Sequence, residues 1–271
     1  MSFLNLANKV VVVFGVANKR SVAYHVARVL EAESAKVIYS VQTPALRESV
    51  GALLPDREVH VCDVQDARQI AALAAVVRKQ HARIDGLVHS VAYADYENYT
   101  GVFHEVTPEQ FLQSMRISCC SLIEIARAFK ELLHERAAVV TISISTTRMA
   151  VESYGYMAPV KAALDSTVVH LAKSFSKFSQ VRFNAVCAGL LKTSASAGIP
   201  GYVDNYLFAE RATLRKRNLD TEEVAHVAAF LLSERASGIN AQGIVVDAGM
   251  GCNYFDEGIV KAVVEHPAEG A

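Results

Sequence analysis

Short apolar runs alternate with stretches of helical periodicity along most of the chain. The run from Lys9 to Phe14 is rich in valine and ends at Gly15, which is typical of a parallel strand covered on both faces. Further runs of this kind occupy residues 36–41, 58–64, 86–91, 139–144, 181–187 and 243–246. Helical spacing is found over residues 21–31, 67–80 and 108–133 and again after Met157. The alternation predicts an α/β fold with a single doubly wound parallel sheet and helices on both faces.

The chain is expected to form one catalytic domain over residues 1–255, because no repeat, low-complexity tract or linker interrupts the pattern. Residues 193–217, with Gly198, Pro200 and Gly201, form a long insert without a clear strand. Inserts of this length commonly cover a binding site, so we call this segment the flap. Residues 256–271 are expected to form a C-terminal extension.

Composition narrows the class of protein. Of the 271 residues, 52% are hydrophobic and 20% charged, which excludes a disordered chain. The formal net charge is −1, so neither nucleic acid nor an anionic membrane is an expected partner. No apolar run approaches the roughly 18 residues of a membrane span, and the N-terminus carries no signal-peptide pattern.

Cysteine and histidine patterns point away from structural metals. The five cysteines are odd in number and include no Cys-x-x-Cys pair, which disfavours a disulfide framework or a zinc ribbon. Buried thiols in a reducing, cytoplasmic compartment are the simpler interpretation. The nine histidines show no paired metal-ligand spacing, so no metal is expected. His89 is expected to pack at a strand end rather than to act as a base.

The loop after the first predicted strand is a candidate phosphate site. Gly15 permits an unusual backbone turn, and a helix that begins near Ser21 would point free N–H groups at a pyrophosphate. The fingerprint Gly-x-Gly-x-x-Gly is absent, because Ala17, Ser21 and Ala23 are small but are not glycines. An ordinary strand-to-helix turn remains the alternative.

Two later strand ends offer partners for an adenosine group. Gln42 follows the second predicted strand and could hydrogen-bond a ribose hydroxyl, whereas the basic Arg47 lies farther on. NADP sites usually place a basic residue at this strand end, so the pattern favours NADH. Asp63 follows the third strand and could receive an adenine amino group, or it could cap the next helix.

Tyr154 and Lys161 form the candidate catalytic pair. Pro159 suits the first turn of a helix, and the seven-residue spacing allows both side chains to reach one cleft. A phenol can donate a hydrogen bond to a developing oxyanion, and an ammonium group can hold ribose hydroxyls. A packed tyrosine and a surface lysine are the alternative on spacing alone.

The sequence resembles the short-chain dehydrogenase/reductase superfamily, and within it the NADH-dependent enoyl-[acyl-carrier-protein] reductases of bacterial type II fatty-acid synthesis. The resemblance covers about residues 1–255. The motifs that carry it are Gly15-Val16-Ala17-Asn18-Lys19-Arg20-Ser21-Val22-Ala23, Cys62-Asp63-Val64, His89-Ser90-Val91-Ala92-Tyr93-Ala94, Tyr154-x6-Lys161 and Ala188-Gly189-Leu190-Leu191-Lys192-Thr193-Ser194-Ala195. Ordinary superfamily members have Tyr-x-x-x-Lys, which would require a tyrosine in place of Met157.

The resemblance implies a Rossmann fold, a role for each matching residue, and a homotetramer. The catalytic residues would be Tyr154 and Lys161. The cofactor would contact Gly15, Ser21, Val22, Gln42, Asp63, Val64, Ser90, Ala92, Lys161, Leu191 and Thr193. The acyl substrate would contact Ala94, Tyr154, Ile199, Tyr202 and Tyr206. One departure is Ile144, which stands where many relatives carry a further active-site aromatic residue.

The implied reaction is transfer of a hydride from NADH to the β-carbon of a trans-2-enoyl thioester on an acyl carrier protein. Tyr154 would stabilise the resulting enolate. Two alternatives remain: a short-chain carbonyl reductase, which the missing Tyr-x-x-x-Lys disfavours, and a non-catalytic dinucleotide-sensing module, which has no need of Tyr154 and Lys161.

Overall fold

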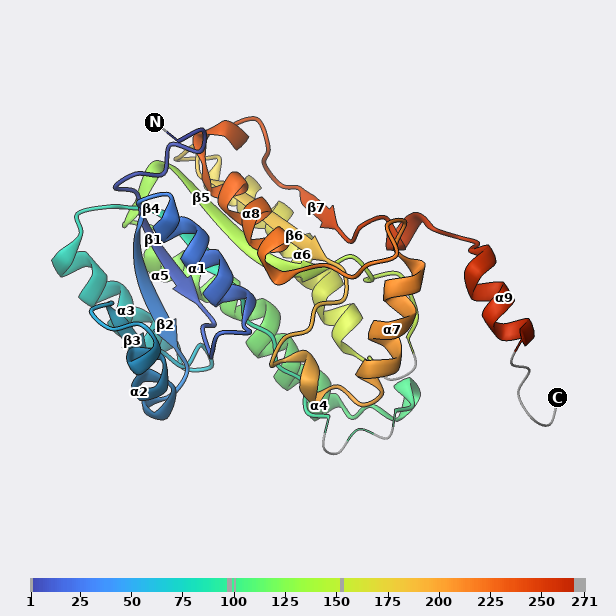
Figure 1. Ribbon diagram of the computed structural model, residues 1–271. Coiled ribbons are helices and arrows are strands. Elements are labelled where there is room, and N and C mark those ends of the chain that lie inside the picture. The colour runs from blue at the N-terminus through green and yellow to red at the C-terminus, as the bar shows by residue number, and fades with distance from the viewer. Residues whose placement is uncertain (1, 97–98, 100, 152–153, 266–271) are drawn as a thin grey trace.

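Seven parallel strands form one sheet in this computed structural model, which describes residues 2–96, 99, 101–151 and 154–265 (Figure 1). The strand order is β3-β2-β1-β4-β5-β6-β7. The strands are β1 (Val10–Phe14), β2 (Lys36–Val41), β3 (Val59–Val61), β4 (Ile84–His89), β5 (Leu133–Ile144), β6 (Arg182–Ala188) and β7 (Gly243–Val246). The chain order therefore reverses between β1 and β4, and ligands of doubly wound sheets bind at the carboxyl ends of the strands beside such a reversal.

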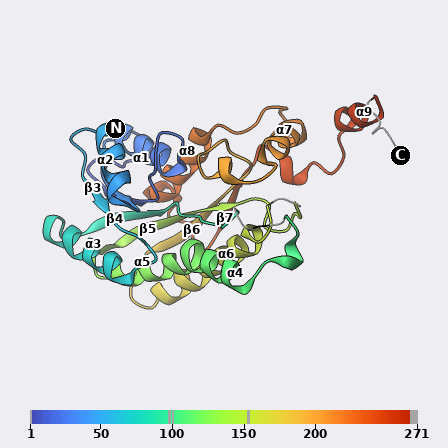
Figure 2. The ribbon, with the colours of Figure 1, turned by 90° about the horizontal axis from the view of Figure 1, so that it is seen from below.

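Helices cover both faces of the sheet, as predicted (Figure 2). One face packs against α1 (Val22–Ala32), α2 (Pro44–Leu53) and α8 (Thr221–Leu232). The other face packs against α3 (Ala67–Gln80), α5 (Ser121–Phe129) and α6 (Met157–Phe175). Both faces of β1 are buried, because Val12 and Phe14 belong to one hydrophobic core and Val11 and Val13 to the other. This two-sided burial explains the uninterrupted apolar run.

The predicted helix over residues 108–133 is interrupted. It consists of α4 (Pro108–Met115), a π-helical turn (Arg116–Cys120) and α5, and residue 133 already begins β5. The spacing of apolar residues hardly distinguishes a continuous helix from two helices joined by a π-helical turn, because such a turn inserts a single residue into the helix. The helices α2 and α8 were not singled out in the sequence, although Thr43 caps α2 by accepting a hydrogen bond from the Leu46 amide.

The flap begins with a 3-10 turn (Ser196–Gly198) and continues as α7 (Tyr202–Ala212). Beyond β7, α9 (Glu257–Glu265) contacts α7 and projects from the body of the molecule (Figures 1 and 2). None of the helices in the described part of the chain combines the length and the apolar character needed to cross a membrane.

Candidate active site

A cavity of about 670 Å³ opens at the carboxyl ends of the strands. Residues that follow or end β1, β2, β3, β4, β5 and β6 all contribute to its wall, and the flap contributes Ser194, Ile199 and Tyr202. A cavity of this size lies within the range of about 300–1,000 Å³ typical of cofactor sites.

The turn after β1 lies against the strand end of β4. Gly15 has a φ of +97°, and a Cβ atom at this position would be 2.0 Å from the carbonyl oxygen of Ser90. Only glycine fits this close approach. Ser21 then closes the turn, since its hydroxyl donates to the Asn18 carbonyl (2.6 Å) and accepts from the Ala17 amide (3.3 Å). The helix α1 starts at Val22, which lines the cavity. The free backbone N–H groups of its first turn therefore lie at the cavity wall and favour binding of an anion there.

The ends of β2 and β3 form the adjoining part of the wall, which includes Gln42, Asp63 and Val64. Asp63 does not cap α3, because the Asp66 carboxylate accepts from the Arg68 amide and fills that role. Asp63 instead accepts from the Gln65 amide at 3.0 Å, which fixes its carboxylate at the strand end.

Tyr154 and Lys161 both line the cavity. The helix α6 begins at Met157, so Tyr154 lies three residues before the helix and Lys161 lies in its first turns. Gly155 adopts a φ of +53°, and a Cβ atom there would lie 2.6 Å from the Tyr99 ring. This left-handed residue lets Tyr154 enter the cavity while Tyr156 enters the core, where it is fully buried.

Lys161 is a buried amine, 4% exposed. It donates hydrogen bonds to the carbonyl oxygens of Ile142 (2.7 Å) and Val91 (3.3 Å). Burial lowers its pKa to about 8, and Asp165 partly opposes this decrease. Burial raises the pKa of the Tyr154 phenol, which is therefore protonated and able to donate a hydrogen bond near neutral pH.

His89 is buried, as expected, and does not line the cavity among the described residues. Its ring nitrogens make 2.8 Å hydrogen bonds with the hydroxyls of Thr141 and Ser121. Burial, with a smaller effect of Lys161, lowers the pKa of His89 to about 3. The ring is therefore neutral at physiological pH and connects β4 to β5 and α5.

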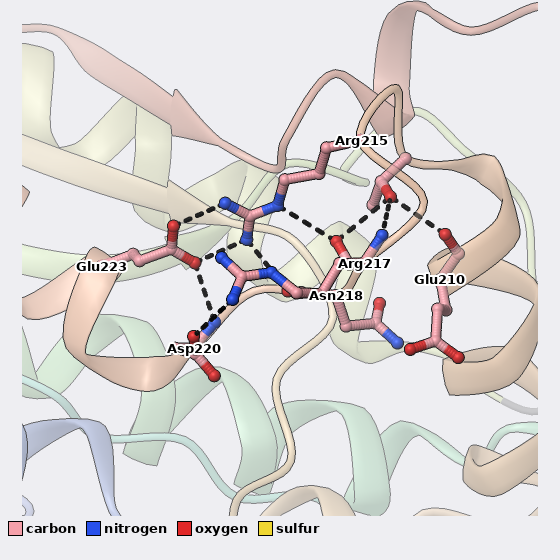
Figure 3. A network of polar contacts seen from close by, with 7 residues as sticks. Glu210, Arg215, Arg217, Asn218, Asp220 and Glu223 are labelled. Atoms are coloured by element: carbon pink, nitrogen blue, oxygen red, sulfur yellow. Dashed lines mark hydrogen bonds and ion pairs between the residues drawn. The ribbon is translucent and has the colours of Figure 1, made fainter.

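Hydrogen bonds and an ion pair attach the flap to the body of the protein. The Ser194 hydroxyl bonds the Asn18 side-chain oxygen at 2.9 Å, and the Tyr202 hydroxyl donates to the Leu191 carbonyl at 2.6 Å. At its far end, Arg215 binds Glu223 of α8 through two 2.6 Å contacts and also donates to the carbonyls of Arg217 and Asn218 (Figure 3). Arg215 lowers the pKa of the Glu223 carboxyl to about 2, so the pair stays charged.

The structure brings nearly all the predicted site residues together. The cavity wall contains the two catalytic candidates, all the predicted cofactor contacts, and Ala94, Ile199 and Tyr202 of the predicted substrate contacts. Tyr206, the remaining predicted substrate contact, does not belong to the cavity wall among the described residues. It lies one helical turn beyond Tyr202 on the same side of α7, and its ring packs 6.3 Å from the Tyr202 ring, which separates it from the wall by one turn of the helix.

Other wall residues were missed in the sequence. Tyr96, Gln113, Ile117 and Met157 reach the cavity from the loop after β4, from α4, from the π-turn and from α6. None of them directly follows a predicted strand, and that position was the signal that located the candidate phosphate and adenosine contacts. Across the described part of the chain, no cluster of three His, Cys, Asp or Glu side chains could hold a metal ion.

Known proteins are similar to this chain in sequence and in fold. Residues 15–251 match the family described as Enoyl-(Acyl carrier protein) reductase. The enoyl-[acyl-carrier-protein] reductase [NADPH] FabI of Staphylococcus aureus is 34% identical over 251 residues, which are 91% of this chain and 98% of that protein. The enoyl-[acyl-carrier-protein] reductase [NADH] FabI of Enterococcus faecalis is 34% identical over 246 residues, 90% of this chain and 98% of that protein.

A solved structure agrees with these sequence matches. The crystal structure of the enoyl-[acyl-carrier-protein] reductase (NADH) from Aquifex aeolicus aligns with a TM-score of 0.88 at 31% identity. The alignment covers 93% of this chain and 99% of that chain.

Proposed function

Since this chain belongs to the enoyl-(acyl carrier protein) reductase family, we propose that its cavity binds NADH and an enoyl thioester side by side, with Tyr154 and Lys161 as the catalytic residues. The chain is an NADH-dependent enoyl-[acyl-carrier-protein] reductase of fatty-acid synthesis. The observation that supports this proposal most directly is that Tyr154 and Lys161, seven residues apart, line the same cavity as the turn at Gly15.

The cavity wall suits a dinucleotide. Gly15 leaves no room for a side chain against Ser90, and the N-terminus of α1 favours a pyrophosphate. Gln42, Asp63 and Val64 would hold the adenosine end, and Ser90, Ala92, Leu191 and Thr193 would frame the ribose and nicotinamide. Lys161 is the one cation among the described wall residues, so a 2′-phosphate would meet no basic partner beside Gln42. This arrangement supports NADH over NADPH.

The protein's contribution to the reaction is electrostatic. The bound nicotinamide supplies a hydride for the β-carbon of the enoyl thioester. Negative charge then develops on the thioester oxygen, and the protonated Tyr154 phenol donates a hydrogen bond to it. The Lys161 ammonium would hold ribose hydroxyls and add positive potential, and a proton taken from solvent at the α-carbon would complete the saturated product.

Two further assignments rest on the family. The substrate is an acyl thioester of the carrier protein, and Ala94, Ile199 and Tyr202 would contact its acyl chain. A homotetramer is supported by β7, which lies at the sheet edge and exposes 58% of Val245. Light scattering after size-exclusion chromatography tests this assembly, and a monomer in solution would contradict it.

Loss of NADH absorbance with crotonyl thioester tests the function, with a panel of ketones as the control. Tyr154→Phe should lower kcat about 100- to 1,000-fold, the usual effect of removing one oxyanion donor. Because Tyr156→Phe leaves the cavity phenol in place, it should retain far more of kcat. Wild-type turnover by Tyr154→Phe would refute the catalytic assignment, and reduction of ketones alone would refute the substrate class.

A further inference from the structure

The segment 90–96, which connects β4 to the rest of the cavity wall, has no regular secondary structure. Ser90, Val91, Ala92, Tyr93, Ala94 and Tyr96 all line the cavity. A strand or helix would hold such a wall by its own backbone hydrogen bonds. Here other groups must hold the backbone in place, since irregular segments are otherwise mobile.

Three side chains hold this backbone at alternate residues. The Lys161 amine donates to the Val91 carbonyl at 3.3 Å. The Ser118 hydroxyl accepts from the Tyr93 amide at 2.9 Å and lies 3.3 Å from the Tyr93 carbonyl. The Tyr156 hydroxyl donates to the Asp95 carbonyl at 2.9 Å. None of the three partners belongs to the segment: Lys161 lies on α6, Ser118 on the π-helical turn, and Tyr156 immediately before α6.

Ser118 reaches Tyr93 because of the π-helical turn. Its side chain is fully buried, and its neighbours in the turn are also engaged. Within the turn, the Cys119 thiol contacts the Thr167 hydroxyl of α6 at 3.4 Å, and directly after the turn Ser121, the first residue of α5, shares a hydrogen bond with His89. Such turns occur often at functional sites because they redirect side chains within a helix. This one directs a hydroxyl at the cavity wall.

Tyr156 is held just as firmly. Its ring is fully buried among Tyr96, Tyr99 and Phe111, with centroid separations of 6.4, 5.8 and 6.4 Å. The position of its hydroxyl is therefore set by packing before any substrate binds. Tyr96, which packs on this ring, also belongs to the cavity wall.

We infer that Ser118 and Tyr156 are positioning residues for the enoyl reductase, which fix the segment 90–96 so that its cavity face meets the nicotinamide and the acyl thioester. This inference rests on the proposed function. Neither residue lines the cavity among the described residues, so both act through the segment and not on the reacting atoms. Tyr156, which is only two residues from Tyr154, thus acts from the core side of the cavity wall.

The test uses Ser118→Ala and Tyr156→Phe in the full-length protein. Ser179→Ala is the matched control, because the Ser179 hydroxyl also donates to one backbone carbonyl (Phe175) and accepts from one backbone amide (Val181), at the other end of the sheet. Tyr156→Phe keeps the buried ring, so it remains informative if Ser118→Ala folds poorly.

Both variants should raise the KM for crotonyl thioester about 3- to 10-fold, the effect of one neutral hydrogen bond, with kcat within about 3-fold. They should also accelerate hydrogen exchange in peptides that span 90–96, whereas Ser179→Ala should change neither quantity. Unchanged exchange in both variants, or unchanged KM with faster exchange, would overturn the inference. If wild-type protein reduced no enoyl thioester, the proposed function would fail, and exchange together with NADH affinity would still decide whether these residues hold the binding wall.

Discussion

Gly15 and Ser90 meet backbone to backbone, because a Cβ atom on Gly15 would lie 2.0 Å from the Ser90 carbonyl oxygen. This contact joins the turn that would hold a pyrophosphate to the segment that would face the nicotinamide. The strands β1 and β4 are parallel, and Phe14 pairs with His89 at their carboxyl ends. The contact between Gly15 and Ser90 therefore continues this pairing by one residue beyond the strands.

Gly15→Ala should damage both the site and the fold. The added methyl group conflicts with Ser90, and the φ of +97° is strained for alanine. We expect a loss of about 2–4 kcal/mol in the free energy of unfolding and at least a tenfold weaker affinity for NADH. Gly51→Ala is the control, since nothing lies within 4 Å of its Cβ position in α2. That variant should be about 0.5–1 kcal/mol more stable. Equal stabilities measured by urea unfolding would contradict the prediction.

Tyr202 and Tyr206 should differ in their effect on substrate binding. Only Tyr202 lines the cavity, and its hydroxyl bonds the Leu191 carbonyl at 2.6 Å. Tyr202→Ala should raise the KM for an enoyl thioester about tenfold or more, whereas Tyr206→Ala should change it by less than about threefold. Steady-state kinetics with a long-chain substrate give the comparison. A larger effect at Tyr206 would show that the substrate path runs outside this cavity.

The Lys161 charge should make NADH affinity depend on pH. Its pKa is about 8 in the folded protein, below the ordinary value of 10.5, because of burial. The ammonium is therefore lost as pH rises through about 8, and the dissociation constant for NADH should increase above that pH. The sign for stability is opposite: the unfolded chain binds more protons between about pH 8 and 10.5, so this group's contribution to stability increases with pH there.

Fluorescence titrations of NADH between pH 7 and 9.5 measure the effect. Lys161→Arg, which stays charged, should show a flat profile in the same range. A flat wild-type profile would mean that the charge of Lys161 does not contribute to binding.

His89 should contribute to acid sensitivity. Its pKa of about 3 in the folded state is lower than the ordinary 6.5, so only the unfolded chain takes up this proton between those values. The contribution of His89 to stability is present above about pH 6.5 and decreases by about 1.4 kcal/mol per pH unit below it. Urea unfolding at several pH values should show a shallower slope for His89→Asn than for wild type. Parallel slopes would contradict the lowered pKa.

The local sequence was sufficient for the fold class and for most of the site. Central strands such as β1 are buried on both faces and therefore have uninterrupted apolar runs. The edge strands β3 and β7 are only partly buried, but their short apolar segments could also be found in the sequence. In a parallel sheet the residues after successive strands meet at one edge, which is why Gly15, Gln42 and Asp63 could be assigned to one cavity, whereas Ser90 was assigned through the family resemblance. The resemblance carried by the Tyr154-x6-Lys161 spacing then identified the chemistry.

Tertiary structure alone decided which residues of each element reach the cavity. Tyr206 shares its helix and residue type with Tyr202, yet only packing against the body of the protein determines which ring reaches the wall. Ser118 is one serine within an apparently continuous helix, and the π-turn that directs it at Tyr93 has no periodic signal. Contacts such as Tyr156 with Asp95 join residues 61 positions apart. Local pattern cannot specify them, because their geometry depends on how β4, α5 and α6 pack together.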